Sequence, residues 1–307
     1  MKHSQLIKKR AKEIGLDAYG ICRAVIPENS KTMLKDWLGK DYYAGMDYMA
    51  RNLDKRLDPS LLVEGAKTAV VCLISYKQPE TVSRQAPRIA EYALGTDYHY
   101  TLKAMLNSLW EYMTELFPES SGRAFTDSAP LAERSLAVQA GLGWIGQNSM
   151  LINPELGSYT LIGTILTDAE TDEYDAPYLG DHCGKCGKCV RACPTGAINP
   201  DRTVNANLCL SYHTIENRGQ IPDEIAAHLT EWMFGCDICQ QVCPHNKKAH
   251  AKPHPVFTIT DNIDKITPEE WLAMGRGEFT RRFGSTPLSR AGLKKIKQII
   301  RLVQGVK

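Results

Sequence analysis

The chain has 307 residues, of which 43% are hydrophobic and 23% charged, a composition typical of a soluble globular protein with one large domain or two ordinary ones. Its longest apolar run, at 69–74, is far shorter than the roughly 20 residues of a membrane helix, and charges occupy the first ten residues, where a signal peptide would be apolar. We therefore exclude secreted and membrane-spanning proteins and expect a cytoplasmic one. The formal charge of +2 conceals a basic C-terminal stretch, 276–307, with nine Lys and Arg against Glu278. This stretch is a candidate polyanion contact, and a solvated helix face is the ordinary alternative.

Helices and strands are predicted to alternate over the first 170 residues. Ser4 is placed to cap a helix that ends near Gly15. Three short β-rich segments predict strands, at 18–25, 69–75 and 159–167. Apolar side chains at helical spacing predict two further helices, 99–117 and 130–140, the second beginning at Pro130. This alternation predicts a mixed α/β core built in layers.

The second half of the chain is organised differently. Residues 171–187 are polar and rich in Asp, Gly and Pro, which predicts a domain boundary. The stretch after His245 is predicted to be a loop, and Thr267 opens a helical tail. The expected fold class is therefore α+β, with an α/β domain at 1–172, a cysteine-rich domain at 173–250 and a helical basic tail at 251–307.

The ten cysteines divide into two kinds. Without an export signal they are not expected to form disulfides. Cys22 and Cys72 each lie alone in an apolar run and are predicted to be inert core residues. The other eight fall between 183 and 243.

The eight clustered cysteines have the spacing of iron–sulfur ligands. The run Cys183-x2-Cys186-x2-Cys189-x3-Cys193-Pro194 matches the bacterial ferredoxin pattern for a [4Fe–4S] cluster. A second copy, 236–244, has Met233 where its first cysteine would stand, and Cys209 is the natural replacement. With the ligand exchange of two-cluster ferredoxins, one set is Cys183, Cys186, Cys189 and Cys243, and the other is Cys193, Cys209, Cys236 and Cys239. Zinc, which C-x2-C pairs also bind, is the alternative but does not account for the x2-x2-x3 run.

A glycine-rich segment and an aspartate could each form part of a functional site. Gly141-Leu-Gly143-Trp-Ile-Gly146 spells G-x-G-x-x-G, but it follows a predicted helix rather than a strand, so we reject it as a dinucleotide site. Asp127 has two interpretations. It is either a turn or N-cap residue before Pro130, or a carboxylic acid at a cavity edge, kept partly protonated by burial and able to donate a proton.

These pieces together resemble the epoxyqueuosine reductase family of tRNA-modifying enzymes. The resemblance covers nearly the whole chain, and its most specific parts are the Asp-Ser-Ala-Pro segment and the cysteine pattern. The matching stretches are Asp17–Gly20, Tyr92–His99, Asp127–Glu133, Gly141–Asn148, Gly157–Tyr159, Cys183–Pro194, Cys209–Glu216 and Gly235–Cys239.

The resemblance implies a nitroreductase-like, cobalamin-binding α/β domain fused to a ferredoxin-like domain with two [4Fe–4S] clusters. It implies reduction of epoxyqueuosine to queuosine at tRNA position 34, with Asp127 as proton donor and electrons passing from the clusters to cobalamin. The implied cobalamin contacts are Arg56, Asp127, Leu151, Ile162, Ser211, Cys236 and Asp237. Some relatives carry a cysteine near the cobalt where this chain has Ala90, so a thiolate ligand is not expected there.

The expected partners are tRNA and an unidentified low-potential electron donor, with no membrane, and a monomer is expected. Candidate phosphate contacts are the cations Arg218, Arg281, Arg282, Lys294, Lys295 and Lys297. Two other classes compete. A corrinoid reductive dehalogenase couples the same cofactors but usually bears a twin-arginine export signal, which this N-terminus lacks. A plain ferredoxin-type carrier would not need about 170 residues ahead of its clusters.

Overall fold

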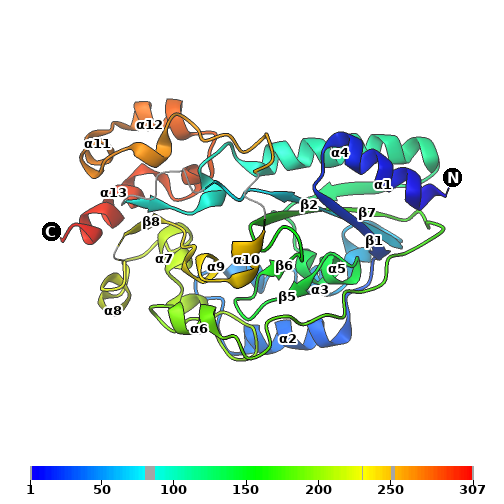
Figure 1. Ribbon diagram of the computed structural model, residues 1–307, viewed down its shortest axis with the longest axis horizontal. Helices are drawn as coiled ribbons and strands as arrows, with labels where there is room; N and C mark the ends of the chain where they lie inside the picture. The colour runs from blue at the N-terminus through cyan, green and yellow to red at the C-terminus, as the bar shows by residue number, and fades with distance from the viewer. Residues whose placement is uncertain (1, 80–86, 230, 250–252, 306–307) are drawn as a thin grey trace.

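The largest sheet has four strands, in the order β1-β2-β7-β4, and every neighbouring pair is antiparallel (Figure 1). We describe a computed structural model over residues 2–79, 87–229, 231–249 and 253–305. The strands are β1 (Ala18–Arg23), β2 (Thr68–Ser75), β7 (Thr160–Thr167) and β4 (Gly122–Phe125). The three strands predicted from the sequence are confirmed, whereas β4 was not predicted.

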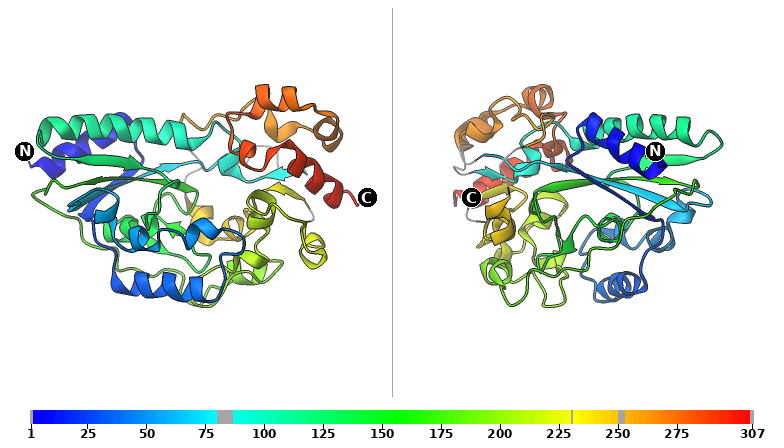
Figure 2. Two further views of the ribbon diagram at one scale, coloured as in Figure 1. Left: turned by 180° about the vertical axis from the view of Figure 1, so that it is seen from behind. Right: turned by 45° about the vertical axis from the view of Figure 1, so that its right-hand side comes forward.

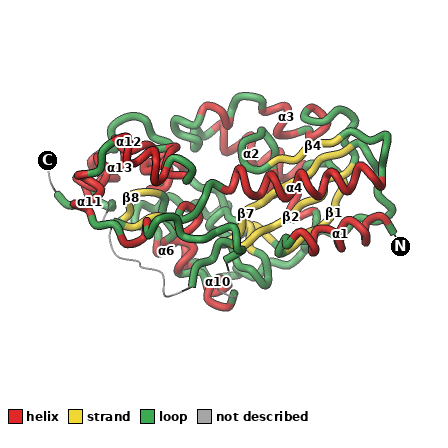
Figure 3. Tube along the Cα trace, turned by 90° about the horizontal axis from the view of Figure 1, so that it is seen from above, coloured by secondary structure: helices red, strands yellow, loops and turns green. Residues whose placement is uncertain are grey.

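The sheet is covered on both faces because its central strand β2 is apolar along 69–74, between Thr68 and Ser75. Every residue of β2 is buried, and side chains alternate between faces along a strand. On one face they pack with α1 (His3–Ile14) and α4 (Tyr98–Leu116), which are seen from above in Figure 3. On the other face they pack with α5 (Glu133–Gln139), which lies below the sheet in Figure 1. Cys22 and Cys72 belong to these layers, and burial raises the pKa of each thiol to about 12. Both are therefore inert core residues, as predicted.

The predicted helix starts are confirmed in part. α4 confirms the predicted helix, but Ser4 does not cap α1. Ser4 lies buried inside the first turn, where the carboxylate of Asp172 accepts its backbone N–H and that of His3. α5 begins at Glu133 rather than Pro130, because the 127–131 segment makes tight turns before the helix begins.

A separate apolar core holds the C-terminal helices against a small parallel sheet. β3 (Arg88–Ile89) pairs with β8 (Trp232–Phe234) (Figure 2). Around this pair lie α7 (Leu210–Ile215), α8 (Asp223–Ala226), α11 (Pro268–Ala273), α12 (Arg276–Phe283) and α13 (Gly292–Val303). Thr267 and Glu270 form a capping box at the start of α11, so the helical tail opens where predicted.

The cysteine region is built from short elements. β5 (Trp144–Ile145) and β6 (Leu151–Ile152) form a hairpin beside α6 (Lys188–Ala192), α9 (Ile238–Gln241) and α10 (Pro244–Lys248). A loop was predicted after His245, and this prediction is wrong up to Lys248, because Pro244 starts helix α10. Part of the predicted loop, 250–252, lies outside the described residues. The chain also contains α2 (Glu28–Gly39) and α3 (Leu53–Leu57).

The glycine-rich segment is not a dinucleotide loop. It follows α5 and enters strand β5 instead of opening a helix. Gly143 has a φ of +147°, and a Cβ there would lie 2.1 Å from the carbonyl oxygen of Ile152. This glycine therefore serves close backbone packing in the hairpin. Among the described residues, no helix has the length and apolar character needed to cross a bilayer.

Candidate functional site

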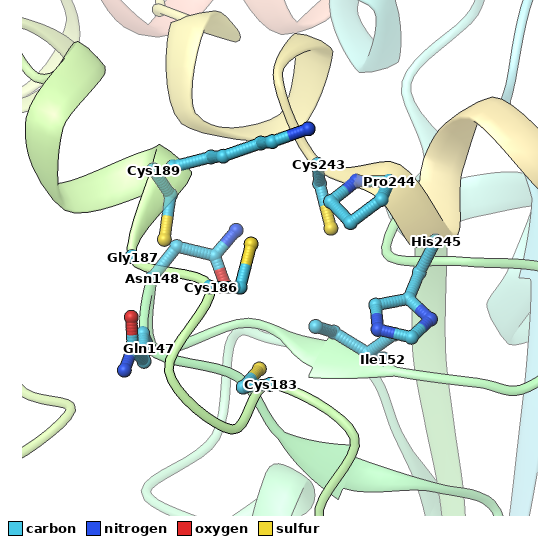
Figure 4. A pocket seen from close by; sticks show the side chains of 11 residues that line it. Gln147, Asn148, Ile152, Cys183, Cys186, Gly187, Cys189, Cys243, Pro244 and His245 are labelled. Atoms are coloured by element: carbon cyan, nitrogen blue, oxygen red, sulfur yellow. The ribbon is translucent and has the colours of Figure 1, made fainter.

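The first predicted cysteine set lines a single pocket. The pocket has an empty volume of about 330 Å³, part of which is open to solvent. Its sulfur atoms come from two separate segments, the 183–189 loop and the residue before α10. Figure 4 shows these side chains around one space, and they are Cys183, Cys186, Cys189 and Cys243. The fold thus brings a cysteine of the second copy to three of the first, which is the exchange predicted from the sequence.

Local backbone geometry shapes this pocket. Gly184 and Gly187 both have positive φ, so the loop can turn tightly between its cysteines. The indole N–H of Trp144 donates to the Cys183 sulfur at 3.4 Å. A donor of this kind stabilises a thiolate. Within the described ranges, no three His, Cys, Asp or Glu side chains are grouped so as to hold one metal ion.

The second predicted set gathers around Cys239. Burial raises the pKa of this thiol well above its usual value, and the nearby Cys236 and Cys209 raise it further. Cys193 faces both Cys209 and Cys236 closely enough to raise their pKa values, after the larger effect of burial. Met233 belongs to the core strand β8 and is fully buried. Cys209 therefore lies close to the other three thiols of this set, as expected for the residue that replaces the missing first cysteine.

Asp127 lies two residues after the end of β4, on a turn with a φ of +54°. Its carboxylate accepts a hydrogen bond from the Tyr98 hydroxyl at 2.7 Å, and the His99 Nε2 atom lies 3.6 Å from the same oxygen. The His99 Nδ1 atom in turn lies 2.7 Å from the carboxylate of Asp97, the N-cap of α4. The Asp127 side chain remains 66% accessible. It is not the N-cap of α5, because Ala132 holds that position.

Charges around Asp127 keep it ionised and keep its neighbours protonated. The interaction with His99, followed by the Tyr98 hydrogen bond, lowers the pKa of Asp127. The expectation that burial keeps this carboxyl protonated is therefore wrong. The same contact with Asp127, together with Asp97, raises the pKa of His99 to about 9. Burial, reinforced by the Asp127 charge, raises the pKa of Glu133 to about 8. Near neutral pH both His99 and Glu133 therefore hold a proton.

Glu133 also fixes the backbone of the turn. Both of its carboxyl oxygens accept the N–H of Asp127, at 3.1 and 3.2 Å. The side chain therefore bridges the start of α5 and the strained turn before it. Arg56, a predicted cofactor contact, carries a positive charge close to both Glu133 and Asp127. Its Nε atom is buried without a hydrogen-bond partner.

Other predicted cofactor positions meet beside the second cysteine set. Ala90 is buried, and a Cβ on Gly235, which has a φ of +70°, would lie 2.5 Å from the Ala90 Cβ. The carboxylate of Asp237 accepts the Glu91 N–H at 2.7 Å, and burial raises its pKa to about 7. Ser211 lies on α7 and is half-buried.

The two remaining predicted cofactor positions lie in the sheet layer. Leu151 is buried and Ile162 half-buried, both within the apolar layer that contains α5. The Ile162 carbonyl accepts the hydroxyl of Thr126, the residue before Asp127. Ile162 therefore lies alongside the Asp127 turn.

The predicted phosphate contacts differ in accessibility. Arg218, Arg281 and Lys294 are exposed, and Lys297 is half-buried. Arg282 pairs with Asp261 and Glu278. Lys295 is only 8% exposed, and its ammonium group lies 3.4 Å from the Gly219 carbonyl. The charge of Arg218 reaches Lys295, so the loop at 217–220 adjoins α13.

Several residues of the Asp127 site were not singled out from the sequence. Tyr98, His99 and Glu133 all lie within stretches that carry the family resemblance, yet none was given a role. The sequence Asp97-Tyr98-His99 at a helix start could have indicated the charged pair, because the carboxylate of an N-cap aspartate can also contact a histidine two residues later. Trp144 gave no comparable signal, since its contact with Cys183 crosses 39 residues.

Comparisons with known proteins agree with this geometry. The family model described as "4Fe-4S double cluster binding domain" matches residues 182–246, and "Epoxyqueuosine reductase QueG, DUF1730" matches 56–128. The epoxyqueuosine reductase of Cyclobacterium marinum is 40% identical over 99% of this chain and 97% of its own length. That of Leadbetterella byssophila is 40% identical over 99% of each chain. This chain belongs to the epoxyqueuosine reductase family.

Solved epoxyqueuosine reductases have the same fold. One, crystallised with an epoxyqueuosine-modified tRNA-Tyr stem loop, has a TM-score of 0.90 at 30% identity, covering 97% of this chain and 80% of that one. Another, from Bacillus subtilis, has its catalytic aspartate loop swung out of the active site; its TM-score is 0.89 at 30% identity, with the same coverage.

Proposed function

We propose that this protein reduces the epoxide of epoxyqueuosine in tRNA to the alkene of queuosine, with Asp127 delivering a proton to the epoxide oxygen. The observation that carries the proposal is the accessible Asp127 carboxylate, held by Tyr98 and His99 in a member of this family. The reaction removes one oxygen as water and consumes two electrons and two protons. A site for it must therefore bring an electron path and a proton source to one place. Membership in this family favours this reaction over carbon–halogen cleavage and over a carrier role.

The proton is held by the neighbours of Asp127. Because Asp127 is ionised at rest and His99 is protonated, a proton passes from His99 through Asp127 to the epoxide oxygen. Protonation turns that oxygen into a better leaving group. Tyr98 and the Glu133 carboxyl hold the Asp127 turn in place through the contacts described above. The aspartate loop that swings out in the B. subtilis relative supports placing the proton donor on this turn.

The electron path is proposed to run through the two cysteine sets. Four thiols around one pocket fit a [4Fe–4S] cluster, since each thiolate binds a different iron. The thiol of Cys189, in the first set, adds to the raised pKa of Cys239, in the second, so the two sets adjoin. The first cluster would be held by Cys183, Cys186, Cys189 and Cys243, and the second by Cys193, Cys209, Cys236 and Cys239.

Cobalamin is the second cofactor of this proposal. When bound, it supplies a low-valent cobalt that is a strong reductant. The unpartnered Nε atom of Arg56 and the accessible Asp127 fit a polar ligand at this turn. The residues proposed to hold it are Arg56, Ala90, Asp127, Leu151, Ile162, Ser211, Cys236 and Asp237. Ala90 offers no thiolate toward the metal.

Each proposed role corresponds to a part of the chain. We assign a nitroreductase-like core and the cobalamin contacts other than Ser211, Cys236 and Asp237 to 1–172, the clusters to 173–250 and phosphate contacts to the tail, 251–307. Arg281 and Lys294 are the exposed cations of the tail that best suit phosphate binding.

Replacing Asp127 by Asn tests the proposed proton role. We expect turnover of epoxyqueuosine-containing tRNA to fall by about 10²–10⁴-fold, the usual contribution of general acid catalysis. Iron content and tRNA affinity should stay unchanged, because the side chain keeps its size and lies outside both cysteine sets. Turnover close to that of the unmodified protein would instead show that Asp127 is only a turn residue.

A further inference from the structure

Basic side chains surround the first cysteine set. Lys185 and Lys188 are exposed on the loop that carries it, and Lys188 lines the pocket. The Arg191 guanidinium donates to the Cys186 carbonyl at 2.8 Å. Lys247 and Lys248 are exposed at the end of α10, just after Cys243. Within the described part of the chain, none of these four lysines forms an ion pair.

An apolar and aromatic ridge adjoins these cations. Leu179 is 93% exposed, the largest value among the exposed large hydrophobic side chains of the described residues. The preceding residue in the chain, Tyr178, stacks on Trp144 with ring centroids 5.6 Å apart. The Trp144 indole in turn donates to the Cys183 sulfur, and His182 packs edge-on against Trp144 at 4.9 Å. Aromatic contacts therefore run from Tyr178, which precedes the exposed Leu179 in the chain, to a thiol of the first set.

We propose that this face, formed by Leu179, Tyr178, Lys185, Lys188, Lys247 and Lys248, is the docking surface of a small acidic one-electron carrier protein. The inference rests on the proposed function, because it assumes that the first cysteine set holds an electron-accepting cluster. On docking, one electron leaves the reduced carrier and enters the first cluster; no bond forms or breaks and no proton moves. Opposite charges speed such encounters and orient the partners.

An acidic protein fits this face better than RNA does. Five of the six candidate phosphate contacts lie on α12 and α13, and the sixth, Arg218, lies on the 217–220 loop beside α13. In Figure 1, α12 lies along the upper edge of the molecule and α6, which follows Lys185, along the lower edge. An exposed leucine beside lysines suits a small protein interface with an apolar centre and a charged rim. The aromatic contacts from this face to Cys183 have no use in binding a phosphate backbone.

Charge reversal tests the assignment. The variant Lys185→Glu with Lys188→Glu is compared with a control, Lys12→Glu with Lys103→Glu, which makes the same charge change on exposed residues of α1 and α4. The probe is flavodoxin, a small acidic flavoprotein. At low ionic strength we expect the first variant to bind oxidised flavodoxin about tenfold or more weakly than the unmodified protein. The control should bind it as the unmodified protein does.

Reduction of the clusters gives the second readout. Reduced flavodoxin should reduce the first variant about tenfold or more slowly, whereas dithionite, which needs no docking surface, should reduce both variants at the unmodified rate. Unchanged flavodoxin binding and reduction in the first variant would overturn the proposal. So would a loss of tRNA affinity with flavodoxin-driven reduction intact, which would make the face an RNA contact. Failure of dithionite to reduce any form would instead overturn the cluster assignment on which the proposed function rests.

Discussion

Replacing His99 by Gln should destabilise the protein in a pH-dependent way. The histidine lies between two carboxylates, 2.7 Å from Asp97 and 3.6 Å from Asp127, and its pKa rises from the usual 6.5 to about 9. A shift of that size corresponds to about 3 kcal/mol. Because 35% of the side chain is exposed, solvent screening reduces the stabilisation, and we expect about 1 kcal/mol.

The sign follows from proton linkage. A raised folded-state pKa stabilises the protein fully below the unfolded value of 6.5, and the stabilisation disappears as pH rises through about 9. Urea unfolding in anaerobic buffer, followed by tryptophan fluorescence, should therefore show the largest loss for His99→Gln at pH 6 and little loss at pH 10. In an Asp127→Asn background the loss at pH 6 should shrink, because one of the two carboxylates is gone. A loss that is equal at both pH values would refute the charge argument and point to packing.

Two other predictions concern the clusters and tRNA. The anaerobically purified protein should contain about eight irons per chain, and Cys209→Ser should retain about half of them; stoichiometric zinc without iron, or full iron in the variant, would contradict the cysteine assignment. Binding of tRNA should weaken with salt, and Arg281→Glu with Lys294→Glu should flatten the salt dependence by about one unit for each lost phosphate contact. The control reversal of Lys12 and Lys103 should leave the slope unchanged, and salt-insensitive binding of the unmodified protein would count against tRNA as the substrate.

The sequence predicted features that depend on local pattern. The apolar stripe of α4 and the β-rich run of β2 were visible because helical and strand periodicities are local. The cysteine spacing was equally visible, because three ligands of the first set, Cys183, Cys186 and Cys189, come from one short loop.

Two features that depend on long-range contacts were not predicted. The first turn of α1 is satisfied by Asp172, which is 168 residues away from Ser4, so Ser4 was wrongly made the cap. The charge state of Asp127 depends on His99, which reaches it from α4, so burial was wrongly expected to keep the carboxyl partly protonated. In both cases the decisive partner is invisible until the chain is folded.

The most direct measurement of the central claim is mass spectrometry of the anticodon nucleoside after reaction. The protein, purified without oxygen and supplied with cobalamin and dithionite, is incubated with tRNA that carries epoxyqueuosine, and the RNA is digested to nucleosides. We predict conversion to queuosine, a loss of one oxygen atom, that depends on Asp127 and on Cys209. Epoxyqueuosine recovered unchanged from protein with its full iron content and bound cobalamin would contradict the account.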